Sequence, residues 1–217
     1  MKKQVQNEEL EKNQSPIDDI VEYISDSIKD EEGNDFIPWV MYPSEADYEH
    51  EGLLIHQVKY DVYIYGPIVE PFIYARLFQI LRNATDTDIV VLHINTPGGS
   101  INTLTAFINI LKETPAFVYC TNDGFAESAG AILLFSGDDV FIPEHSIVLF
   151  HNMRMSTAFQ DTGLLKNNID SNQVLYNNLL KEFCAKVLTS AEMKAITTKG
   201  YELSLTGKEL NKRLKTT

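Results

Sequence analysis

A serine, a histidine and a pair of glycines stand at spacings that suit acyl-transfer chemistry. Ser128 lies among small residues, and Gly98 and Gly99 lie about thirty residues upstream. A serine hydroxyl becomes a nucleophile when a base removes its proton, and the oxyanion that then forms on the substrate needs fixed N–H donors. Glycines leave their backbone N–H groups open to such an oxyanion. His151 is the candidate base.

The neighbours of Ser128 distinguish a nucleophile from an ordinary helix cap. A serine at the start of a helix usually caps the first turn. Here Ala126, Ala129 and Gly130 clear space around the hydroxyl, which a nucleophile needs and a cap does not. A helix N-terminus would also stabilise developing negative charge. We therefore interpret Ser128 as the nucleophile.

Its position in the chain makes His151, rather than the other histidines, the candidate base. His151 ends an apolar strand, at the same end of the sheet as Ser128 if the strands run parallel. The others lie in or near a polar segment, in a turn or inside a strand: His50, His56, His145 and His93. An α/β-hydrolase is excluded, because its acid lies between serine and histidine and its G-x-S-x-G turn is missing. The candidate acids after the histidine are Asp161, Asp170, Glu182, Glu192, Glu202 and Glu209.

Strands and helices alternate around these residues. Apolar runs predict strands at 61–65, 89–94, 116–120, 140–142 and 147–150, and helical spacing predicts helices at 72–81, 101–112, 129–135 and about 163–187. Capping boxes at Thr189 and Thr206 predict two more helices. Repeated βαβ units predict an α/β fold with a mostly parallel sheet that binds ligands at the carboxyl ends of its strands. The glycine turn and Ser128 both fall at such ends.

The acidic charge is concentrated in the first quarter of the chain. The net charge is −13 over 217 residues, and residues 1–51 hold 15 acidic and 4 basic side chains. The remainder holds 16 acidic and 14 basic side chains. Such a nearly neutral body lacks the basic face of a nucleic-acid-binding protein and the polybasic patch of a membrane-surface protein. We expect neither partner.

The sequence has no span of about 20 apolar residues and no signal-peptide core, so we expect a cytoplasmic protein. Cys120 and Cys184 have no metal-ligand or disulfide pattern. We expect no metal and no cofactor.

The N-terminal region differs from the rest of the chain. Residues 1–15 are polar, and Ser15-Pro16 starts a predicted amphipathic helix whose apolar residues run to Ile28. Residues 30–52 are interpreted as an acidic linker with two proline breakers. We therefore expect an extension over residues 1–52 and a catalytic domain over residues 53–217.

Three motifs together resemble the Clp peptidase family, the proteolytic subunit of the ATP-dependent Clp protease. They are 94–99, 124–130 and 147–152, within a resemblance that covers about residues 60–210. It implies a crotonase/Clp-peptidase-like fold with a protruding strand-helix handle. It also implies that Ser128 is the nucleophile, that His151 is the general base and that the N–H groups of Gly99 and Ala129 form the oxyanion hole. The implied reaction is peptide hydrolysis through an acyl-enzyme.

The resemblance also proposes the acid. The family has an aspartate about fifty residues after the histidine, and aligning Leu205-Thr206 with the following helix start puts Glu202 in its place. The chain departs from the family after the histidine, where Asn152-Met153 replaces Gln-Pro. A glycine-free stretch, 154–162, replaces the glycine-rich strand that pairs with substrate.

The family forms homo-oligomeric rings, heptameric or stacked as a double ring, and works with an AAA+ unfoldase ATPase. The implied substrate is an unfolded polypeptide or a peptide. Extended relatives also occur among viral capsid-maturation proteases, so a peptidase that acts in a phage is a variant of this interpretation. Two alternatives stay open. One is a catalytically inactive ring subunit that acts as scaffold or partner, and the other is a crotonase-like acyl-CoA enzyme.

Overall fold

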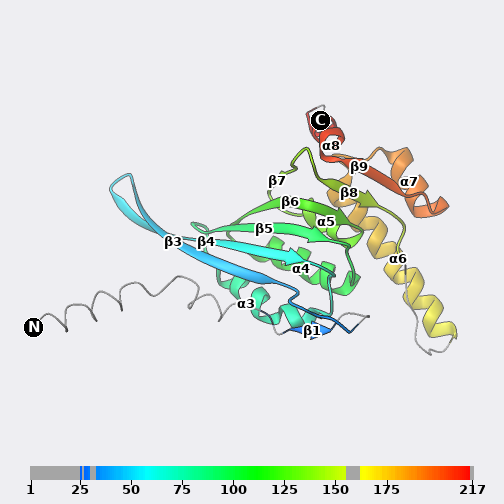
Figure 1. Ribbon diagram of the computed structural model, residues 1–217, viewed down its shortest axis with the longest axis horizontal. Helices are drawn as coiled ribbons and strands as arrows, with labels where there is room; N and C mark the ends of the chain where they lie inside the picture. Colours follow the sequence, from blue (N-terminus) through cyan, green and yellow to red (C-terminus); the bar gives the residue numbers. More distant parts are fainter. Residues whose placement is uncertain (1–24, 26, 30–32, 155–161, 216–217) are drawn as a thin grey trace, which may run out of the picture.

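The computed structural model describes residue 25 and residues 27–29, 33–154 and 162–215. Its main feature is a seven-stranded mixed sheet flanked by helices (Figure 1). The strands are β1 (Ile28–Lys29), β2 (Asp35–Phe36), β3 (Val40–His50), β4 (Leu53–Tyr65), β5 (Ile89–Thr96), β6 (Phe117–Glu127), β7 (Asp139–Phe141), β8 (Ile147–Phe150) and β9 (Leu203–Thr206). The helices are the 3-10 helix η3 (Pro71–Tyr74), α3 (Ala75–Asn83), α4 (Ile101–Glu113), α5 (Ala129–Leu134), α6 (Thr162–Cys184), α7 (Ser190–Lys199) and α8 (Gly207–Leu214).

The strands run in parallel at the centre of the sheet. The order is β3-β4-β5-β6-β8-β9, with β7 also paired to β6. The β4–β5, β5–β6, β6–β7 and β6–β8 pairs are parallel, whereas β3–β4 and β8–β9 are antiparallel. The predicted α/β class is confirmed, and antiparallel strands at both edges make the sheet mixed.

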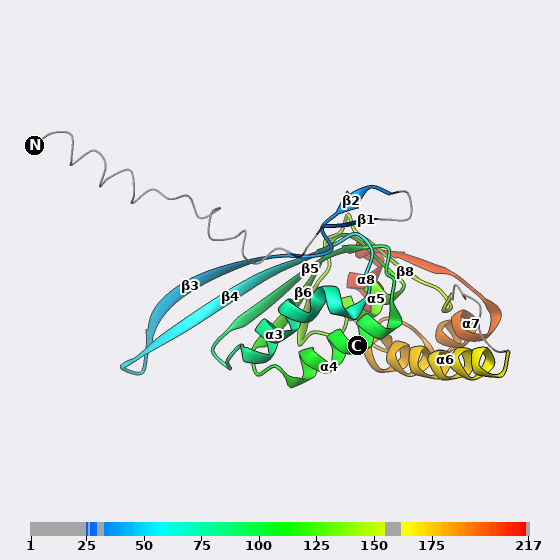
Figure 2. The ribbon, with the colours of Figure 1, turned by 90° about the horizontal axis from the view of Figure 1, so that it is seen from below.

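One face of the sheet is covered by α3, α4 and α5, and Figure 2 shows the first two beneath the strands. In β4 the buried residues Val62 and Ile64 alternate as a period of two requires, whereas β5 is buried more continuously, as is usual for a central parallel strand. Aromatic side chains fill the space between the helices. Phe107 packs edge-on against Phe78 and Tyr74, with ring centroids 4.8 Å and 5.1 Å apart. This core holds the carboxyl ends of the strands in fixed positions.

The predicted linker over residues 30–52 is wrong for residues 40–50, which form β3. The β3–β4 ladder runs from Val40↔Tyr63 to His50↔Leu53. Glu51 and Gly52 both have positive φ, 52° and 78°, as a two-residue hairpin turn requires. The charged residues and the proline that indicated a linker are typical of an edge strand as well. The division of the chain after residue 52 stays a prediction, and the ladder joins its two sides.

Other boundaries differ from the sequence predictions in smaller ways. The predicted N-terminal helix lies outside the described residues up to position 24, and it is wrong at Ile28, which belongs to β1. Strand β6 extends seven residues beyond Cys120, to Glu127, because the parallel ladders to β7 and β8 continue along it. Strand β9 was not predicted. Helix α6 projects from the body, as the helix of the predicted strand-helix handle should (Figure 1), and residues 155–161, where its strand would fall, lie outside the described residues.

Both predicted capping boxes are confirmed. Thr189 caps α7 and Thr206 caps α8, and in each the glutamate three residues on bonds back to the cap. Glu192 of the first box also accepts hydrogen bonds from Arg213 Nη1 at 3.0 Å and Nη2 at 2.9 Å. Chiefly because of Arg213, the pKa of Glu192 falls from 4.5 to about 2. This bidentate pair ties α8 to the start of α7.

The two cysteines are buried and unpaired. Burial raises the pKa of Cys120 to about 12 and raises that of Cys184 as well. Thiols of this kind are unreactive packing residues.

The Glu192–Arg213 pair predicts a pH-dependent contribution to stability. Glu192→Gln should lower the free energy of unfolding near neutral pH by about 1–2 kcal/mol, after allowance for solvent screening. The folded-state pKa is depressed, so the contribution is complete above the ordinary carboxyl pKa and is lost as the pH falls through about 2. Urea unfolding of both proteins between about pH 6 and pH 2.5 should therefore show converging stabilities. Glu182→Gln, which removes an exposed partner of Lys112, is the control. A difference that stays constant with pH would contradict the assignment.

Candidate active site

Ser128 occupies a strained turn between β6 and α5. Its φ of 56° and ψ of −118° lie where a non-glycine residue is rarely found. The turn is held by a 3.0 Å hydrogen bond from the Ser128 N–H to the Leu149 carbonyl. The side chain makes no capping hydrogen bond to α5. Ser128 is therefore not a conventional helix cap, and its half-buried hydroxyl is free of that role.

The glycine turn packs directly on the Ser128 turn. A Cβ on Gly98 would lie 2.8 Å from Ser128 Cβ and 3.0 Å from the Ala129 nitrogen. Gly98 also has a φ of 88°, which favours glycine. Only glycine allows this approach, so the chain between β5 and α4 and the chain between β6 and α5 meet at Gly98.

Two backbone N–H groups face this junction without a described acceptor. Ile68 N–H donates to the Gly98 carbonyl and Ser100 N–H donates to the Ile68 carbonyl, each at 2.8 Å. Gly99 stands between these bonds, and among the described residues its N–H has no acceptor. Ala129 is the first residue of α5, so its N–H has no acceptor within the helix. These are the two donors that the family resemblance assigns to an oxyanion hole.

His151 lies at the same edge of the sheet as Ser128. The parallel β6–β8 ladder pairs Glu127 with Leu149, so the residues that follow both strands emerge side by side. His151 Nδ1 lies 2.6 Å from the Asn152 carbonyl oxygen. A carbonyl only accepts, so Nδ1 is the donor in this contact, and Nε2 holds the lone pair whenever the ring is neutral. This is the tautomer that a general base requires.

Helix α6 holds the His151–Asn152 segment. The Tyr176 hydroxyl donates to the His151 carbonyl, and Gln173 Nε2 donates to Asn152 Oδ1 at 3.0 Å. Tyr176 is buried, and burial raises its pKa. Sequence analysis missed both residues. Their spacing of three on one helix face gave no sign of a role, since such spacing is common in packed helices.

The pairing of β8 with β9 brings Glu202 beside His151, but the Glu202 carboxylate forms its ion pair with another residue. The antiparallel β8–β9 ladder ends at Phe150↔Leu203, so His151 and Glu202 follow as the next facing positions. The Glu202 carboxylate forms an ion pair with Arg154. Among the described residues no hydrogen bond joins Glu202 to His151.

The remaining candidate acids have other roles or positions. Glu192 pairs with Arg213, Glu209 caps α8 and Glu182 pairs with Lys112. Asp170 is exposed on α6, and Asp161 lies outside the described residues. Of the described candidates, Glu202 is the one that a strand ladder places beside His151.

Among the described residues no hydrogen bond joins Ser128 to His151 or to any other histidine. His93 Nε2 lies 3.1 Å from Asp61 Oδ1, and its Nδ1 lies 3.0 Å from Asp123 Oδ2. Both ring nitrogens of His93 therefore have partners within the sheet.

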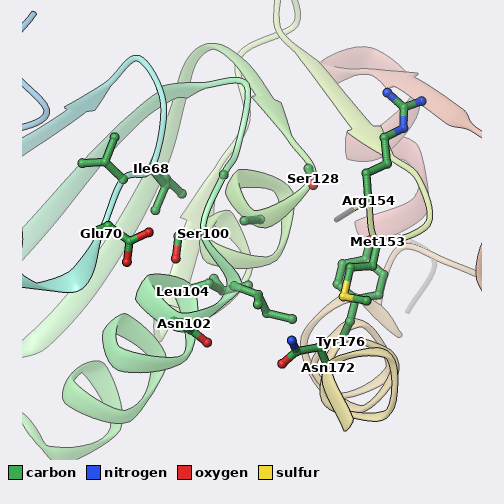
Figure 3. A pocket seen from close by; sticks show the side chains of 14 residues that line it. Ile68, Glu70, Ser100, Asn102, Leu104, Ser128, Met153, Arg154, Asn172 and Tyr176 are labelled. Carbon is green, nitrogen blue, oxygen red and sulfur yellow. The ribbon is translucent and has the colours of Figure 1, made fainter. Parts of the chain in front are cut away.

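A groove of about 620 Å³ opens beside Ser128. Figure 3 shows its walls, which come from the segment before η3, from α4, from the chain after β8 and from α6. The groove reaches Gly99, Ser128 and Ala129, so it adjoins the two N–H donors. A substrate whose carbonyl met those donors would place its adjacent side chain in this groove.

No group of three His, Cys, Asp or Glu residues suited to a metal ion occurs among the residues that the structure describes. In the same part of the chain, no helix is both long enough and apolar enough to cross a bilayer.

The fold and the site define a class of protein. A mixed α/β fold with a glycine turn, a strained serine turn and a histidine at one sheet edge is consistent with the ClpP/crotonase fold. Residues 59–197, more than half of the chain, match the family model described as Clp protease. The chain belongs to the Clp protease family. No curated protein matches it. Members of the family are usually serine peptidases and typically form oligomeric rings.

Because the two turns are in contact, a methyl group added at Gly98 should destabilise the protein more than one added at a glycine in open space. Gly98→Ala should lower the free energy of unfolding by about 2 kcal/mol more than Gly52→Ala, because the added Cβ would also meet the Glu127 carbonyl oxygen at 2.5 Å. Gly52 is the matched control. Its φ of 78° is similar, and a Cβ there meets no described atom within 4 Å. Chemical denaturation compares the two variants, and equal costs would show that the turns are not packed as described.

Proposed function

We propose that this protein is a serine endopeptidase that hydrolyses unfolded polypeptides or peptides through an acyl-enzyme on Ser128. The proposal depends chiefly on one observation. A strained serine with no capping role lies against a glycine turn, with two N–H donors that have no described acceptor and a histidine at the same edge of the sheet whose Nδ1 contacts a carbonyl oxygen. Each part alone has a structural explanation. Together they match the requirements of acyl transfer.

The proposed reaction has two stages. His151 Nε2 removes the Ser128 proton as the hydroxyl oxygen attacks the scissile carbonyl, and the Gly99 and Ala129 N–H groups stabilise the oxyanion. His151 then gives the proton to the leaving amine. In the second stage His151 removes a proton from water, which attacks the acyl-enzyme and releases Ser128.

We propose Glu202 as the acid that orients His151 during this reaction. The β8–β9 ladder places the two residues at facing positions, and a carboxylate on Nδ1 would stabilise the imidazolium better than a neutral carbonyl. Glu202 must leave Arg154 to reach the ring. In the conformation described, the Asn152 carbonyl occupies Nδ1, which preserves the tautomer while Glu202 is engaged.

Two alternatives lead to different results. An inactive ring subunit would explain why the sequence departs from the family pattern after His151. It would not explain why Ser128 keeps a strained backbone conformation. A crotonase-like acyl-CoA enzyme would use the same N–H donors without needing the Ser128 hydroxyl. The finer proposals that follow from family membership are a homo-oligomeric ring, heptameric or double, and an AAA+ ATPase as partner.

A fluorophosphonate should label Ser128 of the native oligomer, as located by peptide mass. Ser128→Ala should abolish labelling, and His151→Ala should slow it by about 10³-fold or more, because the serine loses its base. Ser204→Ala is the control, since Ser204 is an exposed serine of β9 and should change nothing.

Each alternative has its own signature in this experiment. Absence of labelling in a folded oligomer would contradict the peptidase proposal and favour the inactive subunit. Acyl-CoA turnover that survives Ser128→Ala would favour the crotonase-like enzyme.

The role of Glu202 predicts opposite effects of two substitutions that break the same ion pair. Glu202→Gln should lower kcat for a fluorogenic peptide by about 10²-fold or more, since the imidazolium loses its partner. Arg154→Ala should leave kcat unchanged or raise it, because it frees the carboxylate. If Glu202→Gln keeps full activity, Ser128 and His151 act as a dyad oriented by the Asn152 carbonyl.

A further inference from the structure

The groove beside Ser128 contains a carboxylate whose charge is not balanced. Glu70 is the acidic residue that lines it. Its side chain makes no hydrogen bond or ion pair with any residue in the described ranges. The backbone at this point is well fixed, since the Glu70 carbonyl accepts from Ile73 N–H at 3.2 Å and Pro71 begins η3. The charge is therefore held at one wall of the groove.

Arg154, the cationic residue that lines the groove, does not neutralise Glu70. Arg154 lies on the opposite wall, and Figure 3 shows its guanidinium directed away from Glu70. Its partner is Glu202, and its side chain is 74% exposed. Because Arg154 is paired with Glu202 and directed away, a ligand near Glu70 meets the Glu70 carboxylate first, in a setting where solvent screens both charges.

The remaining walls suit a long side chain with an apolar stem. Ile68 and Leu104 are buried apolar residues that line the same groove as Glu70 and Ser128. Asn102 and Asn172 add amide oxygens near the far end of the groove. Lysine and arginine combine an aliphatic stem with a head that only donates hydrogen bonds.

We propose that this groove receives the side chain of the residue before the scissile bond and selects lysine or arginine there, with Glu70 as the specificity-determining residue. The inference rests on the proposed peptidase function. Since Glu70 is exposed to solvent, its ion pair with a cationic substrate side chain should add only as much binding energy as other solvent-exposed ion pairs do. This amounts to about fivefold in kcat/KM for a cationic over a neutral side chain of equal length. An acidic side chain should be disfavoured.

The test compares fluorogenic peptides that end in lysine, norleucine or glutamate at this position. Norleucine keeps the stem of lysine without its charge. The native protein should prefer lysine to norleucine by about fivefold at low salt, and the preference should shrink at high ionic strength. Glu70→Gln should equalise the two substrates by lowering only the lysine value. Glu45→Gln, which removes an exposed carboxylate of the β3–β4 hairpin, should keep the native preference.

The outcomes distinguish the proposed role of Glu70 from the proposed peptidase function. If a fluorophosphonate labels Ser128 but lysine and norleucine react equally, or if Glu70→Gln retains the lysine preference, the role of Glu70 is refuted and the peptidase stands. A preference for glutamate would show that Arg154 controls the groove instead. No labelling of Ser128 and no turnover would refute both proposals.

Discussion

The site depends on the close contact between two turns that have almost no side-chain volume between them. Gly98 touches the Ser128 turn, and a Cβ on Gly130 would lie 2.3 Å from Thr96 Cγ2. Close-packed interiors do not absorb an extra methyl group at such distances without a shift of the backbone. The contact keeps Ser128, the proposed nucleophile, next to the N–H groups of Gly99 and Ala129. Preorganised donors of this kind need no rearrangement when charge develops on the substrate.

The strain at Ser128 is compatible with this arrangement because its surroundings are fixed. The turn follows a strand that pairs with β5 on one side and with β8 on the other. The Ser128 N–H is bonded to β8 itself. A residue in such a conformation costs about 1–3 kcal/mol. The ladders and the buried helix α5 supply the stabilisation, and they also fix where His151 emerges.

The sequence predicted most of what lies in the regular elements and less of what depends on contacts between them. Strand β8 before His151 and the first part of β6 could be predicted because their residues form apolar runs, whereas the part of β6 that leads into Ser128 could not, since polar and small residues interrupt it. Strand β3 could not, because an edge strand tolerates the same charges as a linker. Strand β9 is short, and its pairing with β8 is not local.

The same distinction applies to the site. Ser128, His151 and the glycines stood out by residue type and by their positions after strands. Tyr176 and Gln173 did not, since their contacts with the His151 segment arise only when α6 packs back on the sheet. The resemblance proposed Glu202, and the structure adds that Arg154 competes for it. Glu70 was missed because its proposed role depends on a groove that five separate segments enclose.

The central claim is that Ser128 acts with the Gly99 and Ala129 N–H groups and with His151. The most direct measurement is an experimental structure of the protein after reaction with a peptidyl phosphonate. The account predicts a covalent bond from Ser128 Oγ to phosphorus. It also predicts a phosphonyl oxygen about 2.7–3.1 Å from both nitrogens and Nε2 of His151 beside the adduct. An adduct on another residue, or an oxygen directed away from both N–H groups, would contradict it.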